Sequence, residues 1–324
     1  MYNSEIKKRF IAEFSTSTSR RHAATVMFNT IEPYETEWGA DFCTRSKEEL
    51  EPVVSEIVGF RTNSKKLRLG ILKAYIRWCK ENQIDGVCED LFLIDEIGLD
   101  KFKRQMVANP KHLQRYLDCI CDKESEETVG CIYRCYYWLA YSGMKEEDAL
   151  KVVASDVDLE NTVVRYNGRE YFIYREAVSA FRNCINLTQF RYKHANYKNN
   201  VYKQRAPGDI LLRGISEKSS VEIMRVEMSK RAKVCKFKNE ADKDDKSLDL
   251  KLSFYRVQLS GLFYRTYEAE RAGMPVDFSA AVEQFMEGKT YKLDSGRNLI
   301  GAKKRQLANE YMEDYNRWKE AYSI

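Results

Sequence analysis

The helical periodicity of residues 63–80, NSKKLRLGILKAYIRWCK, limits the folds open to this chain more than any other feature of the sequence. Apolar side chains recur there at spacings of three to four residues, which places them on one face of an α-helix. The residues of this apolar face are Leu67, Ile71, Tyr75 and Trp78. Only five prolines and fifteen glycines interrupt the 324 residues. The sequence therefore predicts a globular and mainly helical protein.

A small β component is expected within the second half of the chain. Residues 161–174, NTVVRYNGREYFIY, alternate around Asn167 and Gly168, a dipeptide typical of a tight hairpin turn. Asn109 and Pro110 interrupt helical periodicity and favour a boundary there. At about 150 residues per domain, the length fits two domains. We therefore predict a mainly α fold with a small β part, divided into residues 1–108 and 109–324.

One face of the predicted helix at residues 63–80 is basic. At about 100° per residue, four cations fall within an arc of about 60°. These cations are Lys66, Lys73, Arg77 and Lys80, and Lys65 and Arg68 lie in the same stretch. No acidic residue occurs between Glu56 and Glu81. This pattern favours a helix along a phosphate backbone, with an ordinary solvated helix as the alternative.

A second acid-free stretch runs between Glu176 and Asp209. Within FRYKHANYKNNVYKQR, at positions 190–205, basic residues alternate with tyrosines. The basic residues are Arg191, Lys193, Lys198, Lys203 and Arg205, and the tyrosines are Tyr192, Tyr197 and Tyr202. Cations neutralise phosphates and tyrosine hydroxyls donate to phosphate oxygens, so this segment is a second candidate nucleic-acid contact. A solvated loop is the alternative interpretation.

Several other classes of protein are disfavoured by the sequence. It has no apolar run of about 18 residues and no signal-like N-terminus, so we expect a cytoplasmic protein that does not enter a membrane. It lacks Walker and Rossmann glycine motifs, and we expect no cofactor. The nine cysteines contain no CxxC pair, which favours buried thiols over a metal site or a disulfide framework. The formal net charge is only +5, so the distribution of charge carries more information than its sum.

Residues 141–159 read YSGMKEEDALKVVASDVDL. This stretch resembles the tyrosine recombinase (phage integrase) family, which has a Thr-Gly-Leu-Arg turn, a downstream acid and an Asp-Ile-Asp step in the same order. The matching residues are Ser142, Gly143, Met144, Asp148, Leu150, Asp156 and Asp158. SFYR, at positions 253–256, stands where the family has His-x-x-Arg. The resemblance covers nearly the whole chain and implies a helical core-binding domain and a catalytic-type domain that form a C-shaped clamp around duplex DNA.

The positions that correspond to the family's phosphate clamp keep positive charge. Family members hold the scissile phosphate with two arginines and use a lysine on the hairpin. Here Lys145 stands at the first arginine and Arg256 at the second, while Arg165 or Arg169 replaces the hairpin lysine. An ammonium group retains the charge of a guanidinium but lacks its two parallel hydrogen bonds. The resemblance therefore implies that phosphate binding is retained.

The positions that move protons or attack the phosphate depart from the family. Ser253 replaces the histidine of His-x-x-Arg, and Lys289 stands where a second late histidine is usual. The nearest candidates for the nucleophilic tyrosine, Tyr311 and Tyr315, come later than the family places it. Serine and lysine cannot act as neutral-pH proton carriers in the way that histidine does. We therefore expect no recombinase activity.

The sequence also resembles the integrase-like repressors of SPβ-type prophages, which implies a transcriptional repressor that maintains lysogeny. The expected partner is double-stranded DNA at operator sites in a phage genome, and the expected location is the nucleoid. An antirepressor and self-association are further candidate partners. The alternatives are a divergent active recombinase that uses Tyr311 or Tyr315, and an accessory factor that bends DNA for another integrase.

Overall fold

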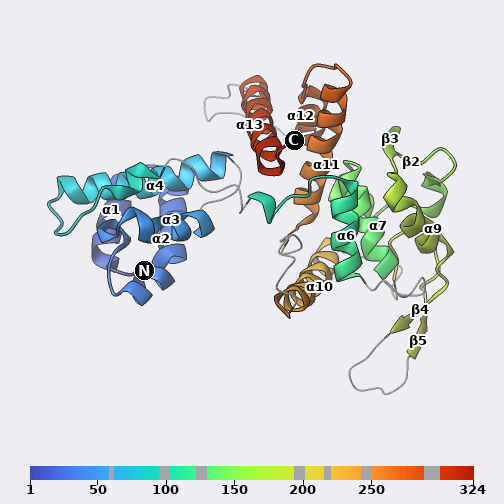
Figure 1. Cartoon of the computed structure of the whole chain (residues 1–324), viewed down its shortest axis with the longest axis horizontal. Helices are drawn as coiled ribbons and strands as arrows, with labels where there is room; N and C mark the ends of the chain where they lie inside the picture. The colour runs from blue at the N-terminus through green and yellow to red at the C-terminus, as the bar shows by residue number, and fades with distance from the viewer. Residues whose placement is uncertain are drawn as a thin grey trace. The chain divides into compact units, whose positions relative to one another are not determined.

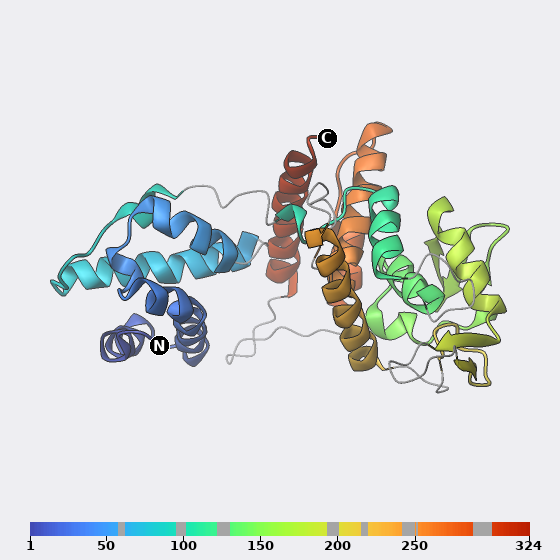
Figure 2. The ribbon, with the colours of Figure 1, turned by 60° about the horizontal axis from the view of Figure 1, so that its bottom comes forward.

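The protein is described here from a computed structural model, whose elements are shown in Figures 1 and 2. The described residues are 1–57, 62–94, 102–121, 130–192, 201–214, 220–241, 250, 252–287 and 300–324. Within them the structure is mainly helical with two small sheets, so the predicted fold class is confirmed at that level. The chain divides into two compact units. Unit 1 consists of Met1–Phe102 with Met286–Ser323, and unit 2 consists essentially of Lys103–Phe285.

Unit 1 is built from helices that surround an aromatic core. Its elements are α1 (Ser4–Phe14), α2 (Thr18–Trp38), η1 (Phe42–Thr44), α3 (Lys47–Ile57), α4 (Thr62–Glu81), η2 (Asp90–Leu93) and α13 (Ile300–Tyr322). The buried ring of Tyr75 on α4 lies 5.0 Å from that of Phe28 on α2 and 5.2 Å from that of Phe10 on α1, centroid to centroid. The apolar face predicted for residues 63–80 thus forms part of this core, although Leu67 is exposed.

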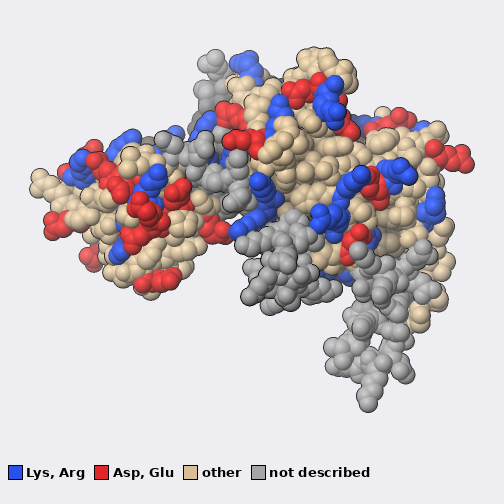
Figure 3. All heavy atoms as spheres, in the orientation of Figure 1, with Lys and Arg blue, Asp and Glu red and all other residues tan. Residues whose placement is uncertain are grey.

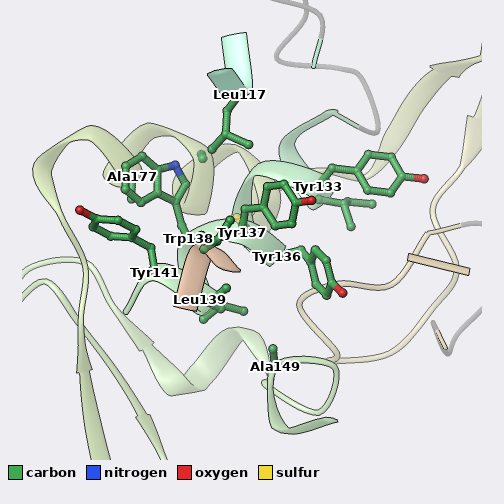
Figure 4. Close-up of a cluster of buried hydrophobic side chains, with 14 of the residues drawn as sticks. Leu117, Tyr133, Tyr136, Tyr137, Trp138, Leu139, Tyr141, Ala149 and Ala177 are labelled. Atoms are coloured by element: carbon green, nitrogen blue, oxygen red, sulfur yellow. The ribbon is translucent and has the colours of Figure 1, made fainter. Parts of the chain in front are cut away.

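Unit 2 is organised around α7. Its helices are α6 (Pro110–Ile120), α7 (Gly130–Tyr141), α8 (Glu146–Ala149), η3 (Ala154–Asp156), η4 (Arg175–Ala177), α9 (Val178–Asn186), α10 (Val221–Ala241), α11 (Phe254–Arg271) and α12 (Ser279–Met286). Tyr136, Tyr137, Trp138 and Tyr141 of α7 are all buried, and Figure 4 shows these rings within the hydrophobic cluster of unit 2. The aromatic density of this segment therefore serves the core.

The strands form one sheet of three strands and a separate pair. The first sheet has the antiparallel order β1 (Val157–Asp158), β2 (Val163–Tyr166) and β3 (Arg169–Phe172), and the pair is β4 (Gln189–Tyr192) with β5 (Val201–Gln204). Asn167 and Gly168 connect β2 and β3 with φ values of 49° and 70°. Positive φ at both central residues is the geometry of a type I′ turn, which Asn-Gly favours. The predicted hairpin is therefore present.

Helices α7 and α11 approach each other closely, and both views of the ribbon show them side by side. A Cβ atom added at Gly261 on α11 would lie 1.8 Å from the backbone oxygen of Tyr141, at the end of α7. Only glycine fits at such a distance. The guanidinium of Arg265, one turn later on α11, donates to the same oxygen from Nη1. Gly261 and Arg265 thus fix the middle of α11 against the end of α7.

The structure divides the chain differently from the predicted boundary at residue 108. Unit 1 extends to Phe102, and the C-terminal helix α13 belongs to unit 1 although Lys103–Phe285 of unit 2 separates the two segments in the sequence. Contact between α13 and α4 accounts for this grouping, and Lys66 Nζ lies 2.9 Å from Glu313 Oε2. A contact between segments so distant in sequence leaves no local pattern from which it could be predicted.

Three expected absences can be compared with the described residues. None of their helices is both long and apolar enough to cross a membrane. Within the same residues, no group of three or more His, Cys, Asp or Glu side chains is arranged to hold a metal ion. Cys119 is disulfide-bonded, which corrects the expectation that every cysteine remains a thiol.

Candidate nucleic-acid interface

The turn at residues 142–145 connects the end of α7 with the start of α8. Gly143 adopts a φ of 99°, which other residues rarely adopt. Lys145 is the N-cap residue of α8, and its backbone oxygen accepts from the amides of Asp148 at 3.1 Å and Ala149 at 2.9 Å. The Lys145 side chain is partly exposed. Lys145 is therefore a helix cap whose side chain lies near the surface.

Two glutamines hold this turn in place. Gln258 on α11 donates from Nε2 to the backbone oxygens of Met144 at 3.0 Å and Gly143 at 3.2 Å. Gln284 on α12 donates to the Gly143 oxygen at 3.2 Å. Because buried backbone groups need such partners, the two amides tie the turn to α11 and α12. These positioning residues were not identified from the sequence, where a glutamine within a helix carries no distinctive signal.

The hairpin reaches the same turn from its other side. Ser142 Oγ donates to the backbone oxygen of Phe172 on β3 at 2.6 Å. Burial raises the pKa of Tyr171 on β3, while a hydrogen bond with Arg169 and the nearby charge of Lys145 act in the opposite direction. Asp148 also lies close enough to influence this hydroxyl. Arg169 and Lys145 therefore share the surroundings of Tyr171.

The structure distinguishes the two arginines that could replace the family's hairpin lysine. Arg165 pairs with Asp158 at 2.8 Å and with Glu170 at 2.9 Å. Hydrogen bonds from Asn161 and Arg165 hold the pKa of Asp158 well below its usual value. In the β2–β3 register, Arg165 lies opposite Glu170 and Arg169 lies opposite Tyr166, so the two arginines point to different faces of the hairpin. Arg169 is therefore the arginine on the side of Tyr171 and the turn.

Arg256 lies in the first turn of α11. Ser253 is the N-cap of this helix, and its Oγ accepts from the Arg256 amide at 3.4 Å. Serine is a preferred N-cap residue, so Ser253 has a structural role at the start of this helix. Partial burial lowers the pKa of Arg256, but a guanidinium remains charged at neutral pH. Two residues further along α11, Gln258 contacts the turn that carries Lys145.

Lys145, Arg169 and Arg256 thus come from three elements that meet at one turn, and we call them the cation set. Arg256 lies at the N-terminus of an 18-residue helix, where the helix dipole also favours an anion. The set can hold phosphate oxygens by charge and by hydrogen bonds. On the face of unit 2 shown in Figure 3, Lys and Arg side chains gather over the part that contains α6 and α7. Lys111 and Arg115 are exposed on α6 and were not predicted.

The basic face predicted on α4 has partners within unit 1. Lys66 pairs with Glu313 on α13 at 2.9 Å, and Lys80 pairs with Glu89 at 2.8 Å. Two further cations lie over the ring of Phe92, with Lys73 Nζ 5.6 Å and Arg77 Cζ 5.0 Å from its centroid. Arg68 donates a hydrogen bond to the backbone oxygen of Ile57. Lys65 is partly exposed. The two ion pairs are exposed, so each contributes at most about 1 kcal/mol.

The expectation that Arg205 contacts nucleic acid is contradicted by its position in the structure. Its side chain is 7% exposed, and its guanidinium donates to the backbone oxygens of Cys184, Leu187, Leu211 and Arg213. All of these acceptors lie inside unit 2, so the Arg205 side chain stabilises the interior and does not face a ligand. An acid-free stretch cannot indicate which of its cations is buried, because burial depends on where the chain turns back after β5.

The other predicted residues of that segment are only partly described. Lys203 on β5 is partly exposed, and Arg191 lies on β4 at a position whose side chain is not described. Lys193, Lys198 and Lys289 lie outside the described residues.

The two candidate nucleophiles lie on α13 in unit 1, whereas the cation set belongs to unit 2. Tyr311 is 4% exposed and Tyr315 is fully buried. The ring of Tyr315 stacks on that of Trp318 at 6.0 Å, with Lys319 Nζ 4.7 Å from its centroid. Both tyrosines therefore have packing roles in this structure.

Comparison with known families gives one match. Residues 1–81 match the family model described as MrpR, N-terminal core-binding domain. The matched segment contains α1 to α4 of unit 1, and a core-binding domain of the integrase type fits the resemblance to tyrosine recombinases. No curated protein matches the sequence.

Proposed function

We propose that this protein is a sequence-specific double-stranded-DNA-binding transcriptional repressor, with an integrase-like two-domain fold and no recombinase activity. The match of residues 1–81 to an integrase-type core-binding domain is the observation that carries DNA binding. The cation set in unit 2 is consistent with it, since β3 and α11, which carry Arg169 and Arg256, both contact the turn that holds Lys145. In this proposal the two units clamp duplex DNA.

The proposal of binding without cleavage rests on which functional side chains the protein keeps and which it lacks. Lys145, Arg169 and Arg256 retain the charge that a phosphate needs, whereas Ser253 is a helix cap in place of a proton carrier. Tyr311 and Tyr315 are buried. Losses within one catalytic unit are strongly non-additive, so the first loss removes most turnover. A protein without turnover is left with occupancy of DNA as its means of action.

The role as a repressor rests on the resemblance to integrase-like prophage repressors and on mass action. Specific DNA-binding proteins reach dissociation constants of about 10⁻⁸ to 10⁻¹¹ M, which keeps an operator filled at modest cellular concentrations. Occupancy of a promoter blocks polymerase. In this proposal the operators lie in a phage genome, the protein resides at the nucleoid and maintains lysogeny, and an antirepressor or self-association tunes occupancy.

Depletion of the protein in its lysogenic host is expected to raise transcription of the genes next to its binding sites within one growth cycle. Chromatin immunoprecipitation before depletion identifies the sites, and RNA sequencing afterwards measures the change. Restoring the protein from a plasmid should restore silencing. If prophage transcription stayed constant while excision frequency changed, the accessory architectural factor would replace the repressor proposal.

No covalent protein–DNA adduct is expected on a nicked duplex that carries the bound site. In such a substrate the cleaved end diffuses away, so an active recombinase accumulates a phosphotyrosyl adduct, which denaturing gels detect. An intact tyrosine recombinase with its own site serves as the positive control. An adduct lost in Tyr311→Phe or Tyr315→Phe would establish the divergent recombinase instead.

A further inference from the structure

The core of unit 1 contains three charged side chains that the proposed function does not use. Lys7 on α1 and Glu35 on α2 are fully buried, and Asp41, just before η1, is 5% exposed. Lys7 Nζ lies 2.5 Å from Glu35 Oε1 and 3.4 Å from Asp41 Oδ2. The same ammonium lies 5.4 Å from the ring centroid of Phe28 and 5.9 Å from that of Tyr75. We call Lys7, Glu35 and Asp41 the buried triad.

The charges of the buried triad do not balance when all three groups are ionised. One cation and two carboxylates give a net charge of −1 in an interior lined by aromatic rings. An unbalanced buried charge is costly, and such groups usually change protonation state instead. No other Lys, Arg or His pairs with Glu35 or Asp41 among the described residues. One carboxyl group of the triad should therefore hold a proton near neutral pH.

The hydrogen bonds of the two carboxyl groups indicate which of them holds the proton. Asp41 accepts from Asn3 Nδ2 at 3.2 Å, from the Tyr75 hydroxyl at 3.0 Å and from the Cys43 amide at 3.2 Å, in addition to its contact with Lys7. Both carboxylate oxygens of Asp41 therefore have hydrogen-bond donors within this core.

Glu35 has fewer partners. Its Oε1 accepts from Lys7 and from the Phe42 amide at 3.1 Å, whereas its Oε2 is buried without a hydrogen-bond partner among the described residues. Burial raises the pKa of Glu35 to about 7, Lys7 opposes this rise, and Asp41 adds to it. The other titratable groups of this region are the Cys43 thiol on η1 and the Tyr75 hydroxyl and Cys79 thiol on α4. Burial raises the pKa of Tyr75, and a hydrogen bond with Cys79 raises that of Cys43.

We propose that Glu35 is a proton-binding site in the core of unit 1: Oε2 carries the proton at and below neutral pH, and its loss weakens the packing of α1 against α2 and α4. Lys7 connects α1 to this change, because its single ammonium group faces two carboxylates once Glu35 has lost its proton. Unit 1 thereby contains a pH-sensitive element that is independent of any DNA contact.

The direction of the pH dependence follows from linkage. A carboxyl group whose pKa is higher in the folded protein binds its proton more tightly there than in the unfolded chain. The stability of unit 1 should therefore decrease as pH rises from the unfolded value of 4.5 to about 7, and this contribution should stay constant above that.

Infrared spectroscopy of the full chain tests the site directly. A protonated carboxylic acid has a C=O stretching band separate from those of carboxylates and amides. We expect such a band at pH 6, its loss with a midpoint near pH 7, and its absence in Glu35→Gln. Absence of the band from the wild-type protein at pH 6 would overturn the proposal without any variant. A band that persists in a folded Glu35→Gln protein would assign the proton elsewhere.

Hydrogen exchange of the α1 amides, corrected for intrinsic rates, provides the second readout. In the wild-type protein, protection of α1 should fall as pH rises from about 4.5 to about 7 and stay constant above that. Glu35→Gln leaves one lysine and one aspartate in the core, so protection should no longer change in that range. Glu37→Gln, on the exposed side of the same helix, should keep the wild-type profile. Equal pH profiles for wild type and Glu35→Gln would contradict the proposed link to α1.

Discussion

Arg169→Gln and Arg256→Gln are each expected to weaken DNA binding by about tenfold to hundredfold. A charge-assisted hydrogen bond contributes about 1.5–3 kcal/mol, and each 1.4 kcal/mol corresponds to about tenfold in affinity. Arg169 shares the surroundings of Tyr171 with Lys145. Arg256 lies on α11, which contacts the turn of Lys145 through Gln258. Because phosphate contacts do not read bases, specific and non-specific duplexes should be affected alike. Fluorescence anisotropy with both duplexes measures the effect.

Arg165→Gln is the matched control. Arg165 lies on the neighbouring strand with similar chemistry, but Asp158 and Glu170 already neutralise it. Its substitution should leave affinity within about fivefold, since an exposed ion pair contributes at most about 1 kcal/mol. For each lost phosphate contact, the slope of log K against log salt concentration should become shallower by about 1. Equal losses for Arg165→Gln and Arg169→Gln would show that the cation set is not the phosphate site.

Gly261→Ala is expected to destabilise unit 2 by about 3 kcal/mol or more. A methyl group there would collide with the Tyr141 backbone oxygen at 1.8 Å, so α11 must move away from α7. Overpacking costs about 1–3 kcal/mol where flexible side chains can yield, and a backbone atom yields less. Such a loss is a large part of a typical total stability of about 5–15 kcal/mol. Hydrogen exchange of α7 in native conditions measures it within the full chain.

Gly70→Ala gives the matching control within a helix. Gly70 lies inside α4, and a Cβ atom added there meets nothing within 4 Å. Alanine is favoured over glycine in a helix interior by about 0.5–1 kcal/mol, so this variant should be slightly more stable than wild type. Wild-type stability in Gly261→Ala would mean that α7 and α11 are not in the close contact described above.

Local patterns were sufficient where neighbours along the chain decide the conformation. The apolar residues at helical spacing in 63–80 fall within α4, and Asn167-Gly168 forms the turn of the β2–β3 hairpin. In each case the determining interactions lie within a few residues: backbone hydrogen bonds in a helix, and positive φ in a turn.

Local patterns were insufficient for deciding what each cation contacts. Arg165 and Arg169 are equivalent in composition, and only the strand register places one against acids and the other beside Tyr171. Arg205 shares an acid-free stretch with surface candidates, yet its guanidinium donates to carbonyl oxygens of the interior. Whether a cation faces solvent depends on elements that are distant in sequence.

The sequence by itself determined the helical class and the hairpin, because each is a property of residue type and near-neighbour spacing. Only the tertiary structure decided that Ser253 caps α11, that α13 belongs to unit 1, that Gly261 permits the contact of α7 with α11 and that three buried ionisable side chains share one core. Each of these features depends on which segments, distant in the sequence, pack against one another. That outcome is set by the packing of the whole chain and leaves no periodic trace in any one segment.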